Sequence, residues 1–202
     1  STLKTTAAVA VPGGTGSLPT QRDSFALIVN KDGTLLLMDP VEGTVRAQAA
    51  TGARGSTSVS PRIFENRACF ADRSGLVVMV DLERMEVLWE RRTGVEILTD
   101  LEIGREGVLA YGNGTLLGFR LDGESLMSPI QGVSAPPLLS RGTVFYGTSD
   151  GDLVVAQASP WKVRGKVPLG DVPSVRPLQV GNTLYVGTRG GSLVRIDTAK
   201  LP

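Results

Sequence analysis

The sequence contains no histidine and one cysteine, Cys69. Without histidine the chain lacks the commonest general base, the Ser/His/Asp and Cys/His catalytic arrangements, and the usual zinc ligand sets. A lone cysteine cannot form an intrachain disulfide, and its place in the apolar run ACFA indicates a buried, inert thiol. The composition therefore offers few groups for catalysis.

A strong charge of either sign is also missing. Lys and Arg number 21 against 20 Asp and Glu, a net charge of +1. That balance gives no long-range field for nucleic acid or an acidic membrane surface. No apolar run approaches the roughly 18 residues that span a bilayer. The sequence begins with Ser1 rather than Met, and a removed signal or lipid-anchor segment is one explanation.

A tight turn that ends in glycine and is followed by an apolar run occurs five times. The anchoring glycines are Gly33, Gly75, Gly114, Gly151 and Gly191. A spacing of about forty residues is typical of propeller blades. Helical repeats of this period would need apolar stripes with a period of 3.6, and none is visible. We therefore expect one all-β domain over residues 1–202, a five-bladed β-propeller without helices.

Each copy contains further strands around its glycine. An apolar strand precedes the turn, as in Phe25 to Val29, and a third and a fourth strand follow, the latter as in Val45 to Ala50 and Met85 to Glu90. A segment with Ser and Pro, such as SVSPRI, supplies the innermost strand, where proline is tolerated. Four antiparallel strands per blade follow from this pattern.

The fifth copy stops after three strands. Residues Leu3 to Val11 occupy the place that a fourth strand holds in other copies. We therefore expect this N-terminal strand to close the fifth blade and with it the ring, because closure removes exposed sheet edges. Exchange of the same strand with a second chain is left open.

The central copy, MVDLERMEVLW, places Asp81 and Trp89 at the spacing of the pyrroloquinoline-quinone-type, or quinoprotein-like, propeller repeat, which it resembles. Arg84 and Met85 stand where that repeat usually has Thr and Gly. Asp39 in the first copy and Asp197 in the fifth match the same acidic position. The resemblance implies that Trp89 docks between blades as a structural residue.

The resemblance points to two functional branches. The family's enzymes are alcohol and sugar dehydrogenases that hold a quinone and calcium on the propeller axis. This chain is shorter than those enzymes and lacks their paired cysteines and a convergent calcium set, so we expect no cofactor and no metal. The other branch includes the periplasmic propeller lipoprotein of the outer-membrane β-barrel assembly machinery. By that analogy we expect a non-catalytic binding or scaffolding module with a protein partner, in the periplasm or cell envelope.

The links into the innermost strands and the turns between the second and third strands share one face of a propeller. The candidate ligand-binding residues on that face or in the channel are Arg54, Arg62, Asp100, Glu102, Arg176 and Arg189. Their mixed charge fits an anionic or sugar-like ligand, or ion pairs around a water-filled channel.

The alternative function is a carbohydrate- or quinone-related enzyme that uses the axial channel. Asp100 and Glu102 are two residues apart, and on one strand they would face the same side as the paired carboxylates of a glycoside hydrolase. The Asp150-Gly151-Asp152 run lacks the distal acid of a calcium loop, and we interpret it as a hairpin turn.

Overall fold

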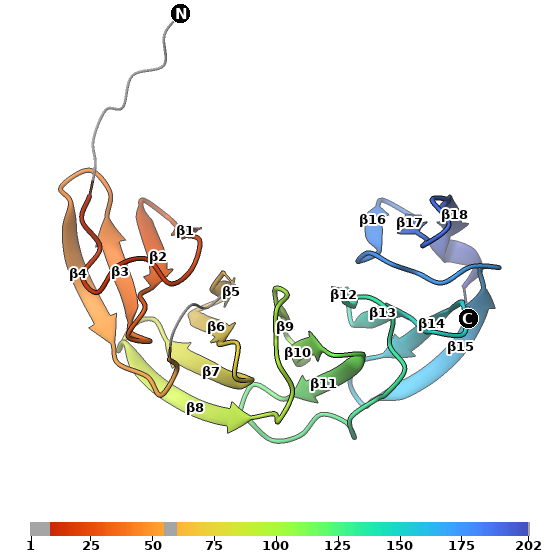
Figure 1. Ribbon diagram of the computed structural model, residues 1–202, viewed down its shortest axis with the longest axis horizontal. Coiled ribbons are helices and arrows are strands. Elements are labelled where there is room, and N and C mark those ends of the chain that lie inside the picture. The colour runs from red at the N-terminus through yellow and green to blue at the C-terminus, as the bar shows by residue number, and fades with distance from the viewer. Residues whose placement is uncertain (1–8, 55–59, 202) are drawn as a thin grey trace, which may run out of the picture. The chain divides into compact units, whose positions relative to one another are not determined.

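The computed structural model describes residues 9–54 and 60–201, which form five consecutive antiparallel sheets (Figure 1). The chain divides into two compact units, Ser1–Asp100 and Leu101–Pro202. Unit 1 holds the first two sheets and unit 2 holds the other three. The all-β fold with five blade-like sheets is thus confirmed.

Unit 1 consists of two four-stranded meanders. The first sheet comprises β1 (Thr20–Arg22), β2 (Phe25–Val29), β3 (Leu35–Asp39) and β4 (Thr44–Ala49). The second comprises β5 (Arg62–Phe64), β6 (Arg67–Ala71), β7 (Leu76–Asp81) and β8 (Glu86–Arg92). Strands hydrogen bond in chain order, so the predicted inner-to-outer sequence of four strands is confirmed here.

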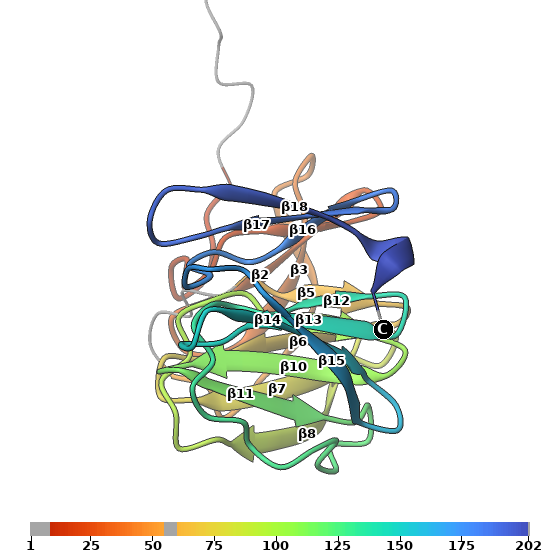
Figure 2. The ribbon, with the colours of Figure 1, turned by 90° about the vertical axis from the view of Figure 1, so that its right-hand side faces the viewer.

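Unit 2 stacks its three sheets in chain order, as Figures 1 and 2 both show. The third sheet comprises β9 (Glu102–Gly104), β10 (Gly107–Gly112) and β11 (Thr115–Phe119). The fourth comprises β12 (Leu138–Ser140), β13 (Thr143–Gly147), β14 (Asp152–Gln157) and β15 (Lys162–Pro168). The fifth comprises β16 (Leu178–Val180), β17 (Thr183–Gly187) and β18 (Leu193–Asp197), followed by the short 3-10 helix Thr198–Lys200.

The anchoring glycines form the turns that the sequence predicts. All five have positive φ, between 73° and 87°. At Gly33 a Cβ atom would lie 1.8 Å from the carbonyl oxygen of Ala53, and at Gly75 one would lie 2.2 Å from that of Val95. Ala53 and Val95 belong to the links that lead into the next sheet. Glycine is therefore required both for the backbone conformation and for close contact of turn and link.

The acidic residue of the repeat fixes the turn into the fourth strand. Asp39 Oδ1 accepts hydrogen bonds from the backbone N–H groups of Val41 and Glu42, at 2.9 and 3.0 Å. Asp81 Oδ1 accepts in the same way from Glu83 and Arg84. These bonds hold the pKa of both carboxyl groups below their usual value, because they favour the charged form.

Apolar side chains between neighbouring sheets form the cores. In unit 1 the cluster includes Leu27, Leu35, Phe70 and Val78, all fully buried. In unit 2, Phe145, Leu153 and Val155 of the fourth sheet pack against Leu184 and Val186 of the fifth. Burying one such side chain contributes about 1.5–3 kcal/mol. Sheet-on-sheet packing is therefore the main source of stability within each unit.

Both tryptophans are at least partly buried. Trp89 on β8 is only 7% exposed, which agrees with a structural role. Trp161 packs against the core between the third and fourth sheets and stacks on Tyr146, with 6.5 Å between the ring centres. The indole ring of Trp89 therefore offers no open platform for a ligand.

One expectation about strands is wrong. The third sheet has no regular fourth strand; instead Ser125 and Ile130 form isolated bridges with Phe119 and Leu116 of β11. Pro129 lies in this segment and lacks the N–H that a regular ladder requires. The 3-10 turn at Thr198–Lys200 was also not expected, and Asp197 caps it by accepting from the N–H of Ala199.

Most of the predicted closing strand, Leu3 to Val11, lies outside the described residues. The described part includes Val9 and Val11, which pack against Ile28, Leu36 and Met38 of the first sheet. Closure of the fifth blade by this strand stays a prediction. Across residues 9–54 and 60–201, no helix has the length and hydropathy needed to cross a membrane.

Candidate functional site

Two of the predicted site residues form an ion pair in unit 2. Glu102, the first residue of β9, is 8% exposed, and its Oε1 lies 2.9 Å from Nη1 of Arg176 in the link before β16. Glu102 Oε2 accepts a hydrogen bond from the backbone N–H of Leu139 on β12, at 3.2 Å. One carboxylate thus joins the third, fourth and fifth sheets.

Buried polar contacts of this kind are costly to break, because an isolated charge then remains in a poorly hydrated place. Both carboxylate oxygens of Glu102 have partners, Oε1 in the ion pair and Oε2 in the hydrogen bond. This side chain therefore holds neighbouring sheets together. A general acid or base would need an oxygen directed at a substrate. The geometry favours the ion-pair interpretation of the predicted residues over the catalytic one.

Asp100 does not share a strand with Glu102, and that expectation is wrong. β9 begins at Glu102, and Asp100 precedes it in a link, where its Oδ1 accepts from the N–H of Ser60 at 3.2 Å. The alternation that sets residues i and i+2 on one side of a strand therefore does not apply. The paired-carboxylate arrangement loses its geometric basis.

The three remaining predicted residues come from different segments of the chain. Arg54 has an exposed side chain, and its backbone N–H donates to Oδ2 of Asp72 at 3.1 Å. Arg62 begins β5 opposite Cys69 and is half-buried. Arg189 is exposed in the β17–β18 turn. Arg54 and Arg62 belong to unit 1, and Arg189 to unit 2.

Asp171 lies in the link before β16 and organises the end of the fifth sheet that carries the β17–β18 turn. Its Oδ2 accepts from the N–H of Gly190, and its Oδ1 from the N–H of Val172, at 2.6 and 2.7 Å. A side-chain hydrogen bond from Thr188, these backbone bonds and the charge of Arg189 hold the pKa of Asp171 below its usual value. The link and turn meet in the fifth sheet, as the sequence predicts.

The chemistry available for a cofactor or metal is limited. Among the residues that the structure describes, no group of three or more Cys, Asp or Glu side chains could hold a metal ion. Cys69 is fully buried, and desolvation raises the pKa of its thiol. The thiolate form that reacts or ligates metals is therefore disfavoured.

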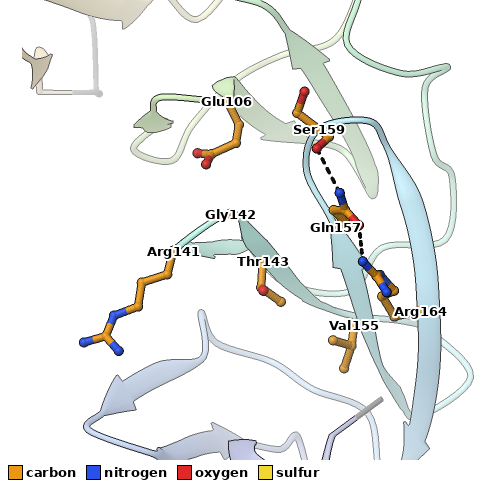
Figure 3. Close-up of a pocket in the computed structure, with 8 residues that line it drawn as sticks. All are labelled: Glu106, Arg141, Gly142, Thr143, Val155, Gln157, Ser159 and Arg164. Atoms are coloured by element: carbon orange, nitrogen blue, oxygen red, sulfur yellow. Dashed lines mark hydrogen bonds between the residues drawn. The ribbon is translucent and has the colours of Figure 1, made fainter.

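A polar pocket of about 330 Å³ lies at the end of the fourth sheet where the β12–β13 and β14–β15 turns meet (Figure 3). Its lining residues are Glu106, Arg141, Gly142, Thr143, Val155, Gln157, Ser159 and Arg164. Gln157 accepts from Arg164 and donates to the carbonyl of Ser159. The sequence analysis did not find this pocket, because its residues come from three separate turns and strands.

The pocket does not contain an acid pair. Glu106 supplies the one carboxylate among its lining residues, and Figure 3 shows the side chain of Arg141 directed away from Arg164. Glycoside hydrolysis uses two carboxyl groups that flank the bond. The lining residues of this pocket therefore do not supply the pair of carboxyl groups for that reaction.

The fifth sheet presents an apolar face that points away from the fourth sheet. Leu178 and Val180 on β16 and Leu193 on β18 share this face by strand register, and they are 60%, 59% and 69% exposed. Val175, 53% exposed, lies over the same face, because a Cβ on Gly187 would be 2.8 Å from it. We call Val175, Leu178, Val180 and Leu193 the fifth-sheet patch.

The position that Leu193 occupies is buried in the fourth sheet. Leu193 pairs with Gly187 as Leu153 pairs with Gly147 in the fourth sheet, yet Leu153 is 0% exposed. Single exposed apolar residues are common, whereas several on one face of a sheet are a candidate interaction surface. The fifth-sheet patch is therefore the best-defined candidate for binding a macromolecule.

Comparison with solved structures supports the β-propeller fold. BamB from Moraxella catarrhalis is similar at a TM-score of 0.75 and 16% identity, over 93% of this chain and 62% of BamB. The computationally designed Ika8 protein is similar at 0.70 and 16%, over 89% and 57%. KlHsv2 with loop 6CD replaced by a Gly-Ser linker gives 0.67 and 11%, over 92% and 63%.

The chain is thus of the β-propeller class, and at these identities the likeness shows the fold alone. It spans less than two thirds of each of these three structures. No protein-family model and no curated protein matches the sequence.

Proposed function

We propose that this protein is a non-catalytic binding or scaffolding propeller that presents the fifth-sheet patch to a protein partner. The observation that carries the proposal is the exposure of Leu178, Val180 and Leu193 on one face of a sheet. An apolar face of this kind gains free energy when a partner covers it. Net charge near zero argues for a protein rather than nucleic acid.

The candidate catalytic groups support the same proposal. Glu102 is engaged by Arg176 and Leu139, and Asp100 lies outside the strand that begins at Glu102. The likeness to BamB at a TM-score of 0.75 fits a propeller whose sheets serve as a frame. We also propose that the blades are of the quinoprotein-like type, on the acidic turn residues Asp39 and Asp81.

The test compares three versions of the tagged full chain in extract of the organism that encodes it. The wild type, Leu193→Asp and Val41→Asp are purified, and retained proteins are quantified by mass spectrometry. Val41 is 87% exposed in a turn of the first sheet, so Val41→Asp is the matched control. One protein retained by the wild type and the control, and lost with Leu193→Asp, is expected. Equal retention by all three variants would contradict the proposal.

The proposed location is the periplasm or cell envelope, and it follows from the resemblance of the repeat. Protease treatment of intact spheroplasts separates the possibilities. Digestion of the protein without lysis is the expected result. Protection until the cells are lysed would overturn the proposed location and leave the binding proposal to its own test.

A further inference from the structure

A second cavity, of about 220 Å³, lies between the fourth and fifth sheets, both of which belong to unit 2. We call it the intersheet cavity. Its wall is built from both sides, by Ser140, Thr143 and Phe145 of the fourth sheet and by Gln179, Thr198 and Leu201 of the fifth sheet and its 3-10 turn. Because the sheets are copies of one repeat, each of these residues has a counterpart between other sheets.

The first counterpart is a bound arginine. Ser140 pairs with Thr143 in the fourth sheet as Arg22 pairs with Phe25 in the first. The guanidinium of Arg22 reaches the second sheet, where its Nη1 donates to the carbonyl of Leu82 at 3.0 Å. In the fourth sheet, two short hydroxyl side chains replace the guanidinium and the aromatic ring. The space that these larger groups fill in unit 1 is therefore open in unit 2.

The opposite wall has changed in the same direction. Gln179 is the middle residue of β16, as Ile63 is the middle residue of β5. Thr198 directly follows the last residue of β18, as Leu82 follows that of β7. Ile63 and Leu82 both belong to the apolar core of unit 1. An amide and a hydroxyl thus stand at places where unit 1 has core residues.

The third and fourth sheets show that the polar wall is not a general feature of unit 2. Leu139 is the middle residue of β12, and Ala158 follows the last residue of β14. They hold the places of Gln179 and Thr198, and both are part of the apolar cluster between those two sheets. The intersheet cavity is therefore a local departure from an apolar pattern.

Gln179 also carries a buried acceptor without a donor. Its Nε2 donates to the carbonyl of Gly181 at 3.1 Å, which fixes the orientation of the amide. Within residues 9–54 and 60–201, its Oε1 has no hydrogen-bond partner, and it is shielded from solvent. Gln21 makes the same bond on β1, to the carbonyl of Asp23, but is exposed to water. An unsatisfied buried acceptor is unfavourable, and a donor that enters the cavity would relieve it.

Arg141 brings a positive charge to this cavity. It lines both the intersheet cavity and the pocket of Figure 3, and its side chain is exposed. The residues that line the intersheet cavity include no carboxylate. Across residues 9–54 and 60–201, Arg141 forms no ion pair. A guanidinium in this setting favours a ligand that carries a carboxylate.

We propose that the intersheet cavity binds a small sugar acid, a ligand that combines hydroxyl groups with a carboxylate. A ligand hydroxyl donates to Oε1 of Gln179, which a turn about the soft terminal torsion directs into the cavity. Ser140 and Thr143 exchange hydrogen bonds with further hydroxyl groups, and the carboxylate meets Arg141. A volume of about 220 Å³ exceeds the roughly 30 Å³ share of one water and lies below the range for drug-sized ligands.

This inference goes beyond the proposed protein-binding function. Gln179 lies between Leu178 and Val180 on β16, and alternate residues of a strand point to opposite faces. The intersheet cavity and the fifth-sheet patch therefore lie on opposite faces of the fifth sheet. Either binding activity can fail in its own test without affecting the other.

The test is a titration of the isotope-labelled full chain with sodium glucuronate, followed by nuclear magnetic resonance. Glucose, a neutral sugar with the same ring, is the matched ligand. We expect saturable shifts of the Gln179 side-chain amide and of the β16 backbone amides. Glucose should bind at least about tenfold more weakly, because it lacks the charged acceptor for Arg141.

Two variants test the assigned contacts. Gln179→Ile installs the residue that the second sheet has at this place, and it should weaken glucuronate binding about tenfold or more. Gln21→Ile, the same change on β1, is the matched control and should bind as the wild type does. Arg141→Asn retains a residue type that tolerates the φ of 49° at this turn, and it should bind glucuronate no better than glucose.

A third variant keeps the proposal testable if Gln179→Ile does not fold. Ser140→Arg introduces the side chain that Arg22 provides in the first sheet, so it should fill the cavity and abolish binding. The midpoint of urea unfolding reports whether each variant is folded. Absence of saturable glucuronate binding would overturn the proposal and leave the cavity to water. Equal binding of glucose, unchanged binding by folded Gln179→Ile or Ser140→Arg, or shifts confined to other sheets would overturn it as well.

Discussion

Breaking the ion pair between Glu102 and Arg176 should destabilise unit 2 without affecting any turnover. The side chains of Arg176 and Glu102 are 27% and 10% exposed, and their charged atoms lie 2.9 Å apart. Replacing Arg176 by methionine keeps much of its volume but removes the guanidinium that lies 2.9 Å from the Glu102 carboxylate. Removal of one partner from a buried pair costs about 3–5 kcal/mol. The partial exposure of Arg176 lets water reach the site, so we expect about 3 kcal/mol.

The assay is hydrogen exchange of the β9 and β12 amides at increasing urea, which reports the free energy of opening unit 2. Glu102→Gln should restore most of the loss in an Arg176→Met background, because it removes the carboxylate charge that Arg176 balanced and keeps an acceptor for Leu139. Arg46→Met, which breaks an exposed pair, is the control and should change little. A loss below about 1 kcal/mol for Arg176→Met, with no recovery in the double variant, would refute this reasoning.

Three further predictions concern single residues. Gly33→Ala should lower the free energy of unfolding by about 2–3 kcal/mol, because it combines positive φ with a clash against Ala53, whereas Gly94→Ala, with open space around it, should cost about 1 kcal/mol in a urea titration. The thiol of Cys69 should react with a disulfide reagent only after unfolding, because it is buried and its pKa is raised; rapid reaction in the native state would contradict this. The pKa of Asp81 lies below its usual 3.8, so its contribution to stability is present above that pH and is lost as the pH falls through the folded value. Thermal unfolding between about pH 5 and pH 2 should therefore show a larger loss for the wild type than for Asp81→Asn, and equal losses would be the contrary result.

The turn chemistry made much of the fold predictable. Glycines that end Asp-Gly, Ser-Gly and Asn-Gly turns leave few alternatives to hairpins, and the strand Phe25–Val29 was predicted with its observed bounds. The third sheet departs from the pattern around Pro129, where local backbone chemistry overrides the repeat.

The candidate site was harder to predict, because it depends on what covers each sheet. Leu153 and Leu193 occupy the same place in the repeat, and only the structure shows that one is buried and the other exposed. The pair of Glu102 and Arg176 joins distant parts of the sequence, although both residues were candidates. Asp100 was wrongly assigned to the strand of Glu102, because the sequence does not mark the residue at which that strand begins.

The most direct test of a protein-binding role is photo-crosslinking from the fifth-sheet patch in living cells. A photoreactive amino acid is introduced at Leu193 or at Val41, and adducts are resolved by mass. The account predicts a discrete adduct with one partner from position 193 and none from position 41. Equal labelling from both positions, or turnover of a sugar or quinone substrate that Glu102→Gln abolishes, would contradict it.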